Sequence, residues 1–89
     1  MRRCMKLIFK ILEYVEREKT NGNKLSIPEF YDYDDSVVNY HVRLCAQAGY
    51  IQIDQVSNFQ VLTAKSIIEL TWAGHQELER MREEGIGDG

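Results

Sequence analysis

The sequence has two cysteines, one proline and no long apolar run. No apolar stretch is long enough to cross a bilayer, so an integral membrane protein is not expected. The N-terminus has basic residues before an apolar stretch, as signal peptides do, but Lys6 and Lys10 interrupt that stretch and no small-residue cleavage site follows. Cys4 and Cys45 both fall on apolar helical faces, which indicates buried thiols rather than a disulfide framework. We therefore expect a cytoplasmic protein.

Basic residues are also scarce in the middle of the chain. Residues 25–64 contain one basic and five acidic side chains, a net charge of −4. Residues 1–24 contain seven basic and three acidic side chains (+4), and residues 65–89 contain three basic and six acidic ones (−3). A strongly electrostatic nucleic-acid binder normally carries a basic patch, and this profile does not indicate one.

Signatures of catalysis are absent as well. The sequence has no phosphate-binding glycine loop and no serine-nucleophile motif. His41 and Cys45 are four residues apart, a spacing that can chelate a metal, but structural zinc sites normally show further closely spaced ligands. We expect His41 and His75 to be semi-buried packing residues, and Cys45 to be unreactive because burial raises the pKa of a thiol. The sequence therefore predicts no enzyme, no metal site and no cofactor.

The 89 residues are enough for one domain. A chain of this size buries roughly 60% of its unfolded surface, and 44% of the residues are apolar, as in ordinary globular proteins. We place a single domain at residues 1–84. The glycine-rich residues 85–89 are expected to form a flexible C-terminal tail.

The stretch from Asp34 to Ile53 is the most informative part of the sequence. It opens with acids and a serine that suit a helix N-cap, and apolar residues then recur at steps of four, three and three. Gly49 stands where a left-handed residue ends a helix, and strand formers follow it. The pattern predicts a helix over residues 35–48, a tight turn and a strand over residues 50–56. The N-cap candidates are Asp34, Asp35 and Ser36, and the apolar face comprises Val38, Val42, Cys45 and Ala48.

Residues 2–19 have the periodicity of an amphipathic helix with a wide apolar arc. Met5 and Phe9 widen this arc beyond a single stripe, so they belong either to the core or to a homodimer contact. The opposite face is basic, and such a face is either solvated or in contact with phosphates. The narrower apolar stripe contains Cys4, Leu7, Ile8, Ile11, Leu12 and Val15, and the basic face contains Arg2, Arg3, Lys6, Lys10 and Arg17.

The segment between these two helices lacks helical periodicity. Residues 24–27 are predicted to form a short strand, which Pro28 ends. The aromatic segment Phe30–Tyr33 is too short for a full helix and holds one turn at most. Its aromatic side chains either fill the core beneath the central helix or stack on bases, and the sequence leaves both readings open.

A β-hairpin and a final helix are predicted after the central helix. Ser57-Asn58 is a turn signal, residues 57–64 are predicted to form the hairpin loop, or wing, and residues 66–70 the return strand. Thr71 is an N-cap candidate for a helix over residues 72–84. Gly74 in its first turn costs about 1 kcal/mol relative to alanine, which the close approach of another backbone would explain. The predicted inner face of this helix consists of Trp72, His75, Leu78 and Met81.

Two stretches, YHVRLCAQAGYI (residues 40–51) and LTWAGHQEL (residues 70–78), resemble the signature of a family of uncharacterised bacterial and phage proteins. In that family a Tyr-His-x-x-Leu-Leu-x-x-Ala-Gly-x-Ile segment is followed, after a β-hairpin, by Leu-Thr-Trp-x-Gly-His-x-Phe-Leu. The resemblance covers residues 5–82. It implies membership of a family without an assigned activity.

More distantly, both stretches resemble winged-helix transcription regulators of the multiple-antibiotic-resistance and phenolic-acid types. In those proteins a helix ending in Ala-Gly-Leu-Ile leads into the wing, and Leu-Thr-x-x-Gly opens the next helix. The resemblance implies a winged-helix fold with DNA binding as the default function. This chain departs from the pattern at Cys45, where leucine is usual, at Phe30–Tyr33, which replaces the second helix, and in its acidic middle region.

The predicted fold is an α+β winged helix-turn-helix. In chain order it has a helix, a short strand, a loop replacing the second helix, a recognition-type helix, a β-hairpin wing and a C-terminal helix. The predicted function is that of a small regulator that binds double-stranded DNA, as a homodimer through the Met5 and Phe9 side of its first helix. The acidic balance of residues 25–64 favours an alternative, a protein-interaction module that kept the fold but binds no nucleic acid. The candidate DNA-contacting residues are Ser36, Asn39, Tyr40, Arg43, Lys65, Arg2 and Lys6.

Overall fold

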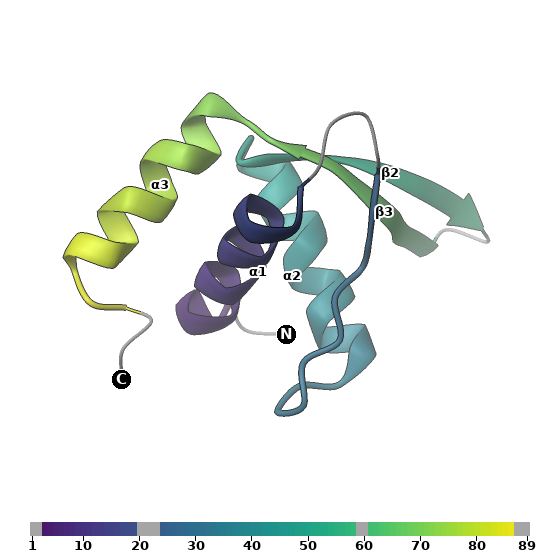
Figure 1. The fold of residues 1–89 in the computed structure, drawn as a ribbon. Helices are drawn as coiled ribbons and strands as arrows, with labels where there is room; N and C mark the ends of the chain where they lie inside the picture. The colour runs from purple at the N-terminus through teal and green to yellow at the C-terminus, as the bar shows by residue number, and fades with distance from the viewer. Residues whose placement is uncertain (1–2, 20–23, 59–60, 87–89) are drawn as a thin grey trace.

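The computed structural model describes residues 3–19, 24–58 and 61–86 of the chain, arranged as three helices and one three-stranded antiparallel sheet. Figure 1 shows α1 between the other two helices, with the β2–β3 hairpin projecting beyond them. The mixed α+β class is confirmed. The elements are α1 (Met5–Glu18), β1 (Leu25–Ser26), α2 (Asp35–Gln47), β2 (Ile51–Asn58), β3 (Val61–Leu70) and α3 (Trp72–Glu83).

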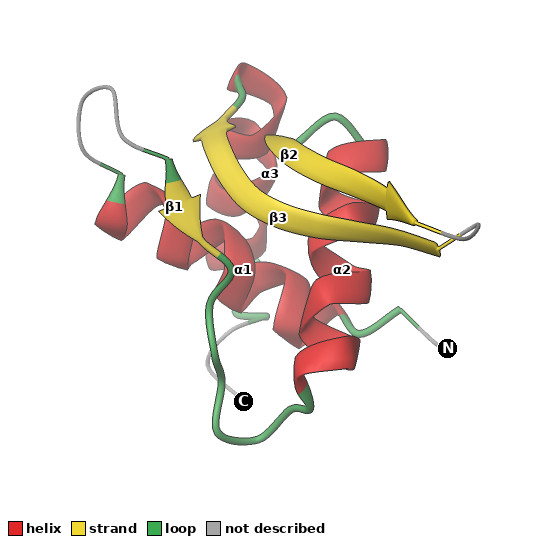
Figure 2. Ribbon diagram, turned by 90° about the vertical axis from the view of Figure 1, so that its right-hand side faces the viewer, coloured by secondary structure: helices red, strands yellow, loops and turns green. Residues whose placement is uncertain are grey.

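The strand order in the sheet is β1-β3-β2, so the short strand that precedes α2 pairs with the second arm of the hairpin. The pairing register of β2 and β3 shifts twice, which leaves Lys65 and Ile68 of β3 without directly opposed partners. Extra residues of this kind bend a strand and increase its twist. Figure 2 shows β3 curving over the helices, as the two irregularities require.

The hairpin differs from its prediction. A loop was expected over residues 57–64, with a return strand starting at Ser66, but β2 continues to Asn58 and β3 begins at Val61. The β-rich run Val61–Thr63 pairs with β2, and this pairing outweighs the turn signal at Ser57-Asn58. Residues 59–60, where the two strands connect, lie outside the described part.

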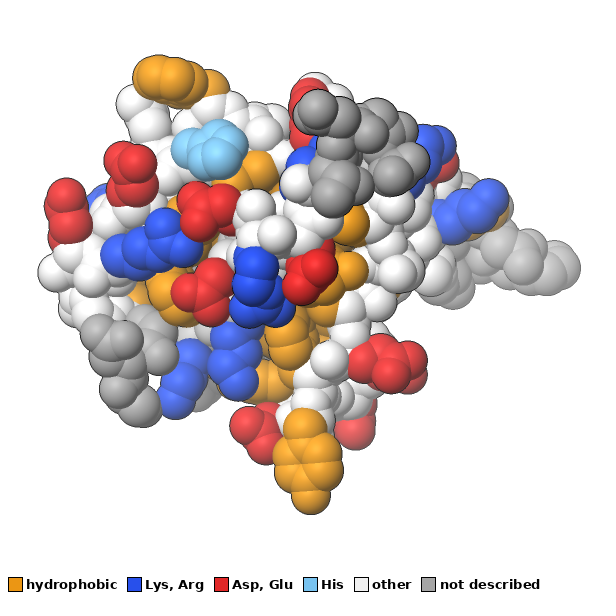
Figure 3. All heavy atoms as spheres, viewed as in Figure 1, with side chains coloured by type: hydrophobic (Ala, Val, Ile, Leu, Met, Phe, Trp, Pro, Cys, Tyr) orange, Lys and Arg blue, Asp and Glu red, His pale blue; other side chains and the backbone are white. Residues whose placement is uncertain are grey.

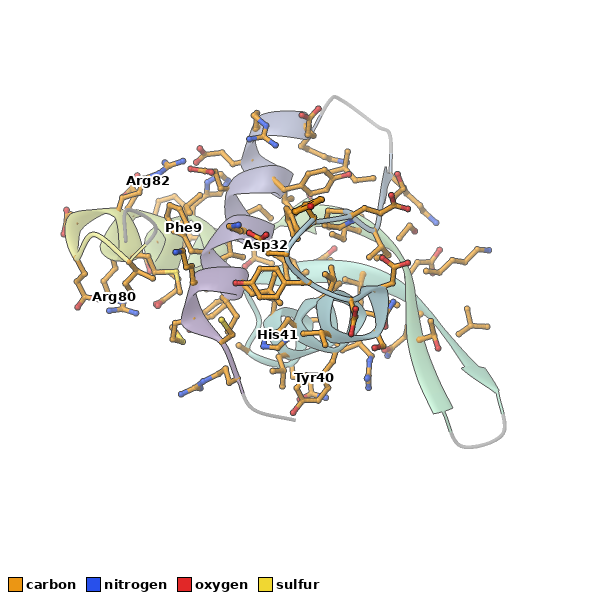
Figure 4. The ribbon with its side chains drawn as sticks, turned by 90° about the horizontal axis from the view of Figure 1, so that it is seen from below. Phe9, Asp32, Tyr40, His41, Arg80 and Arg82 are labelled. Atoms are coloured by element: carbon orange, nitrogen blue, oxygen red, sulfur yellow. The ribbon has the colours of Figure 1, made fainter. Side chains whose placement is uncertain are left out.

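The core explains the wide apolar arc of α1. This helix contacts α2, α3 and β3, so it is covered on more than one side within its own chain. Phe9 is only 8% exposed, and Figure 4 places it between α1 and α3. Phe9 is therefore a core residue, which removes it from the predicted homodimer contact; Met5 is half-buried against the same core. The buried residues of α1 are Leu7, Ile8, Phe9, Ile11, Leu12 and Val15.

The segment before α2 contains one turn and no full helix, as predicted. The predicted packing of its aromatic residues against the core is confirmed for two of the three. Phe30 and Tyr33 pack against the core, and the Lys10 ammonium lies 5.9 and 5.5 Å from their ring centres. Tyr31, in contrast, is fully exposed. The ammonium of Lys10 is also 4.0 Å from the Asp32 carboxylate, so one α1 side chain holds this segment by several contacts.

The C-termini of α2 and α3 end in the same backbone motif. Gly49 and Gly85 have φ of +84° and +71°, a conformation that favours glycine. After each glycine, the backbone N–H of the next residue, Tyr50 or Ile86, donates to the carbonyl oxygen five residues earlier. Ile86 also packs against the core, so the predicted tail is wrong at its first two residues. Residues 87–89 lie outside the described part.

The N-termini of the same helices differ from each other. Thr71 caps α3 as predicted, with its Oγ1 accepting from the Gly74 N–H at 3.0 Å. At α2, Asp34 occupies the N-cap position but its side chain makes no capping hydrogen bond. Asp35 still places an acid in the first turn, where the helix dipole favours it.

The predicted inner face of α3 is half correct. Leu78 and Met81 are fully buried, but Trp72 is 79% exposed and His75 is exposed. Gly74 is the buried residue of the first turn because it packs against the backbone of Tyr50. A Cβ at this position would lie 2.0 Å from the Tyr50 carbonyl oxygen. This close approach, which the sequence predicted, rotates Trp72 and His75 away from the core.

Candidate nucleic-acid interface

The outward face of α2 is the candidate interface, because the sequence places most of the predicted contact residues there. Ser36 and Gln47 are exposed, whereas Tyr40 and Arg43 are half-buried. Figure 4 shows the Tyr40 side chain pointing away from the other elements. These four residues come from successive turns of a helix that is fixed to the core by its opposite face, Val38, His41, Val42 and Cys45.

The side chains of Tyr40 and Arg43 pack against each other on this face. The guanidinium carbon of Arg43 lies 5.6 Å from the Tyr40 ring centre, a cation–π distance. The Arg43 Nε atom is buried and has no hydrogen-bond partner in the described part of the chain. A buried donor without a partner is costly, and its burial keeps it from an external acceptor, which leaves the terminal nitrogens of the guanidinium as the groups that can bind an anion. The stack holds the Arg43 guanidinium against Tyr40 of α2, which makes Arg43 the strongest single candidate for an anion contact.

Asn39 has a different role from the one expected. Its Nδ2 donates to the Ala64 carbonyl oxygen at 2.9 Å, and its Oδ1 accepts from the Ala64 N–H at 3.0 Å. The whole side-chain amide is therefore engaged with β3. Asn39 positions the hairpin relative to α2 instead of presenting its amide to a base edge.

His41 is buried, as predicted, and both ring nitrogens are engaged. Its Nε2 accepts from the backbone N–H of Cys4 at 2.8 Å, and its Nδ1 lies 2.8 Å from the Val37 carbonyl oxygen. Because a carbonyl oxygen only accepts, Nδ1 is the donor and Nε2 the acceptor of the ring. His75, the other histidine, is exposed and lies 3.9 Å from Glu16, so its predicted packing role is wrong.

The basic candidates outside α2 are placed unevenly. Lys65 is exposed on the bulged part of β3, next to the Asn39–Ala64 hydrogen bonds. Lys6 is exposed on the first turns of α1. Arg2 lies outside the described residues, so its predicted role stays untested. Its neighbour Arg3 was assigned to the basic stripe and omitted from the site, although it is exposed close to α2.

Arg3 borders a small hollow where the start of α1 meets the end of α2. The hollow measures about 410 Å³ including its open mouth. Helical periodicity within α1 does not reveal this juxtaposition, because it depends on how α1 crosses α2. The lining residues are Arg3, Met5, Ile8, Leu44, Cys45, Ala48 and Tyr50.

Most other cations of the described part are paired with carboxylates. Figure 3 shows acidic and basic side chains interleaved over α1 and α3. Arg82 of α3 lies 2.8 Å from Glu16 of α1, and Lys24 lies 2.7 Å from Asp54, where its hydrogen bond lowers the pKa of the carboxyl. Further pairs are Lys10–Asp32, Arg17–Glu18, Arg80–Glu77 and Arg80–Glu84.

Three basic side chains differ from these. Within residues 3–19, 24–58 and 61–86, no carboxylate oxygen lies within 4.0 Å of Arg3, Arg43 or Lys65. Arg3 precedes α1, Arg43 belongs to α2, and Lys65 belongs to β3 of the hairpin. The acids Asp34 and Asp35 stand at the opposite, N-terminal end of α2, so the charge of the candidate face changes sign along the helix.

Cys45 is buried, as predicted, whereas Cys4 is half-buried at the N-cap of α1. Burial raises the pKa of the Cys45 thiol to about 12, which keeps it protonated at neutral pH. His41, four residues earlier, already uses both nitrogens in hydrogen bonds. Across the described residues, no group of three or more histidine, cysteine, aspartate or glutamate side chains is arranged to hold a metal ion.

The helices of the described residues are too short or too polar to cross a membrane. Residues 2–87 match the model of the family described as "Hypothetical protein (DUF2513)". An uncharacterised protein of Haemophilus influenzae is 29% identical over 86 residues, which cover 97% of this chain and 72% of the relative. No solved structure matched the chain. The chain therefore belongs to the DUF2513 family.

Proposed function

We propose that this protein is a DNA-binding domain of the winged-helix type, with α2 as the helix that enters the major groove and the β2–β3 hairpin as the wing. The strand order β1-β3-β2 and the passage from α2 through Gly49 into the hairpin support this assignment. A recognition helix contacts base edges with its exposed polar side chains while neighbouring cations bind phosphates.

The observation that carries the proposal is the distribution of paired and unpaired cations. Cations on α1, α3 and beside β1 are largely neutralised by nearby carboxylates. Arg43, Arg3 and Lys65 have no carboxylate oxygen within 4.0 Å in the described part and stand on or beside α2 and its hairpin, although the charge of Lys65 helps to lower the pKa of Asp54. A cation without an internal partner keeps its full charge for an external anion, and phosphate contacts provide most of the affinity of DNA-binding proteins.

In this arrangement Ser36 and Tyr40 face base edges, and Arg43 binds either a guanine edge or a phosphate through the terminal nitrogens of its guanidinium. Lys65 and Lys6 lie near phosphates on either side. Asn39 contributes indirectly, because its two hydrogen bonds to Ala64 set the distance between helix and wing.

One observation favours a second candidate, a protein-interaction module. Tyr31 is fully exposed at the tip of the segment before α2, in an acidic surrounding. Exposed aromatic residues are enriched at protein interfaces. A basic protein surface would fit this segment, whose acids are Glu29, Asp32, Asp34 and Asp35.

An electrophoretic shift with random duplex DNA at low salt tests the first candidate. We expect the wild-type protein to bind, and Arg43→Ala to weaken binding and to lower the slope of log K against log[salt] by about 0.9. Arg17→Ala is the matched control, since it removes one charge from the far end of α1. Absence of any shift at low salt would rule out DNA binding. If Tyr31→Ala then abolished capture of a basic protein, the second candidate would replace the first.

A further inference from the structure

The start of the chain is attached to α2 by one buried side chain. His41 is 1% exposed, and its Nε2 accepts the backbone N–H of Cys4, the N-cap residue of α1. The Cys4 side chain makes no capping hydrogen bond of its own. Residues at a helix N-cap normally need a local acceptor for such an N–H. Here the acceptor comes from another helix, 37 residues away in the sequence.

The geometry around His41 leaves little freedom. The Val37 carbonyl holds the Nδ1 side, and the Tyr40 ring meets the imidazole edge to face, with 5.4 Å between ring centres. The Cys4 thiol in turn lies 3.9 Å from the Tyr33 hydroxyl. The entry into α1 is thus fixed relative to the α2 turn that carries the Tyr40–Arg43 stack.

Arg3 is the residue that this attachment places. It directly precedes Cys4, is exposed, and lies beside Leu44 and Ala48 of α2. In the described residues it has no carboxylate partner within 4.0 Å. The second arginine, Arg43, stacks on Tyr40, which precedes His41 in the sequence. His41 therefore fixes the backbone next to Arg3 through Cys4, and its imidazole packs against the Tyr40 ring, on which Arg43 stacks.

We propose that His41 is a positioning residue that holds Arg3 beside α2, so that Arg3 and Arg43 contact separate phosphates of the DNA backbone. This inference rests on the proposed DNA-binding function and extends its surface across the junction of α1 and α2. The ligand chemistry is that of a phosphodiester backbone, because two guanidinium groups on a fixed support favour anionic oxygens that are spaced along a chain. Asp34 and Asp35 lie at the N-terminal end of α2, whereas Arg3 lies beside its C-terminal end.

The test measures thermodynamic coupling between residues 41 and 3, which a purely structural role would not produce. We compare binding of a random duplex by wild type, Arg3→Ala, His41→Leu, and the double variant, by fluorescence anisotropy over a salt series. Arg3→Ala is expected to weaken binding roughly tenfold and to lower the salt slope by about 0.9. In the His41→Leu background the same change is expected to have no further effect. Arg43→Ala is expected to weaken binding in both backgrounds.

Two further variants distinguish loss of the hydrogen bond between Cys4 and His41 from unfolding of the protein. His41→Gln keeps a side-chain acceptor and is expected to restore the effect of Arg3. Cys4→Pro removes the donating N–H while leaving His41 intact, and is expected to act like His41→Leu. Hydrogen exchange at the Cys4 amide, followed by NMR, reports the attachment without DNA: slow in wild type and fast in His41→Leu.

The outcomes distinguish failure of the proposed DNA-binding function from failure of the positioning role of His41. Absence of duplex binding by the wild type overturns the proposed function and the phosphate role of Arg3 with it. Binding by the wild type, with an equal effect of Arg3→Ala in the wild-type and His41→Leu backgrounds, overturns the positioning role of His41 alone. A fast-exchanging Cys4 amide in the wild type overturns the attachment itself.

Discussion

The side chain of Asn39 forms two hydrogen bonds with a single residue, Ala64. The amide nitrogen donates to its carbonyl oxygen and the amide oxygen accepts from its N–H, at 2.9 and 3.0 Å. Ala64 is 3% exposed and stands next to Lys65, one of the two irregular positions of β3. Ala64 is opposed by Gln55 of β2, so the side chain of Asn39 ties a paired residue of the hairpin to α2.

Replacing Asn39 by alanine tests this tie. The change leaves a buried backbone N–H and C=O without partners, so we expect the free energy of unfolding to fall by about 2 kcal/mol. Urea denaturation measures it, with Ser36→Ala at an exposed position of the same helix as the control. Equal stabilities of the two variants would show that water replaces both bonds without cost.

Gly74 provides a steric prediction. A Cβ at this position would lie 2.0 Å from the Tyr50 carbonyl oxygen, which already accepts from the Thr71 N–H. Gly74→Ala should therefore lower the free energy of unfolding by about 3 kcal/mol, despite the higher helix propensity of alanine. The neighbouring Ala73→Gly, at an exposed position, should cost about 1 kcal/mol. Thermal and urea unfolding of both variants give the comparison, and a smaller loss for Gly74→Ala would contradict the contact.

The Cys45 thiol provides a prediction at alkaline pH. Its pKa rises from 9.0 to about 12 because burial disfavours the thiolate. The unfolded chain therefore loses this proton first, and the stability associated with the neutral thiol is complete below pH 9 and falls as the pH rises from 9 toward 12. By about pH 10 the wild type should lose about 1 kcal/mol more than Cys45→Val, which does not titrate. Urea denaturation of both proteins at neutral and alkaline pH checks this, and parallel losses would show that Cys45 is accessible.

Asp35 is expected to have opposite effects on stability and on DNA affinity. Its carboxylate stands in the first turn of α2, where the helix dipole favours it, so Asp35→Asn should lower the free energy of unfolding by about 0.5 kcal/mol. The same change removes a negative charge from the candidate interface and should tighten duplex binding at low salt. Glu79→Gln on α3 is the charge-matched control. An affinity no higher than that of Glu79→Gln would place the interface elsewhere.

The order and nature of the elements follow from local chemistry, and the sequence predicted them. Gly49 and Thr71 mark helix boundaries because the conformations and hydrogen bonds they supply are local to a few residues. Periodicity likewise identified most of the buried faces of α1 and α2, including Val38, Val42 and Cys45, although Ala48 of the predicted face is exposed. The close approach at Gly74 was also predicted, because a glycine in the first turn of a helix needs a reason beyond propensity.

The partners of individual side chains depended on tertiary structure. Asn39 is a polar residue on the outer side of its helix, and only the position of β3 gives it Ala64 as a partner. Phe9 widens an apolar arc, and only the packing of α3 covers it. The position of Arg3 beside α2 depends on a hydrogen bond between residues 4 and 41. Sequence periodicity reports which face of an element is apolar, whereas the crossing of elements far apart in the chain determines what each polar group meets.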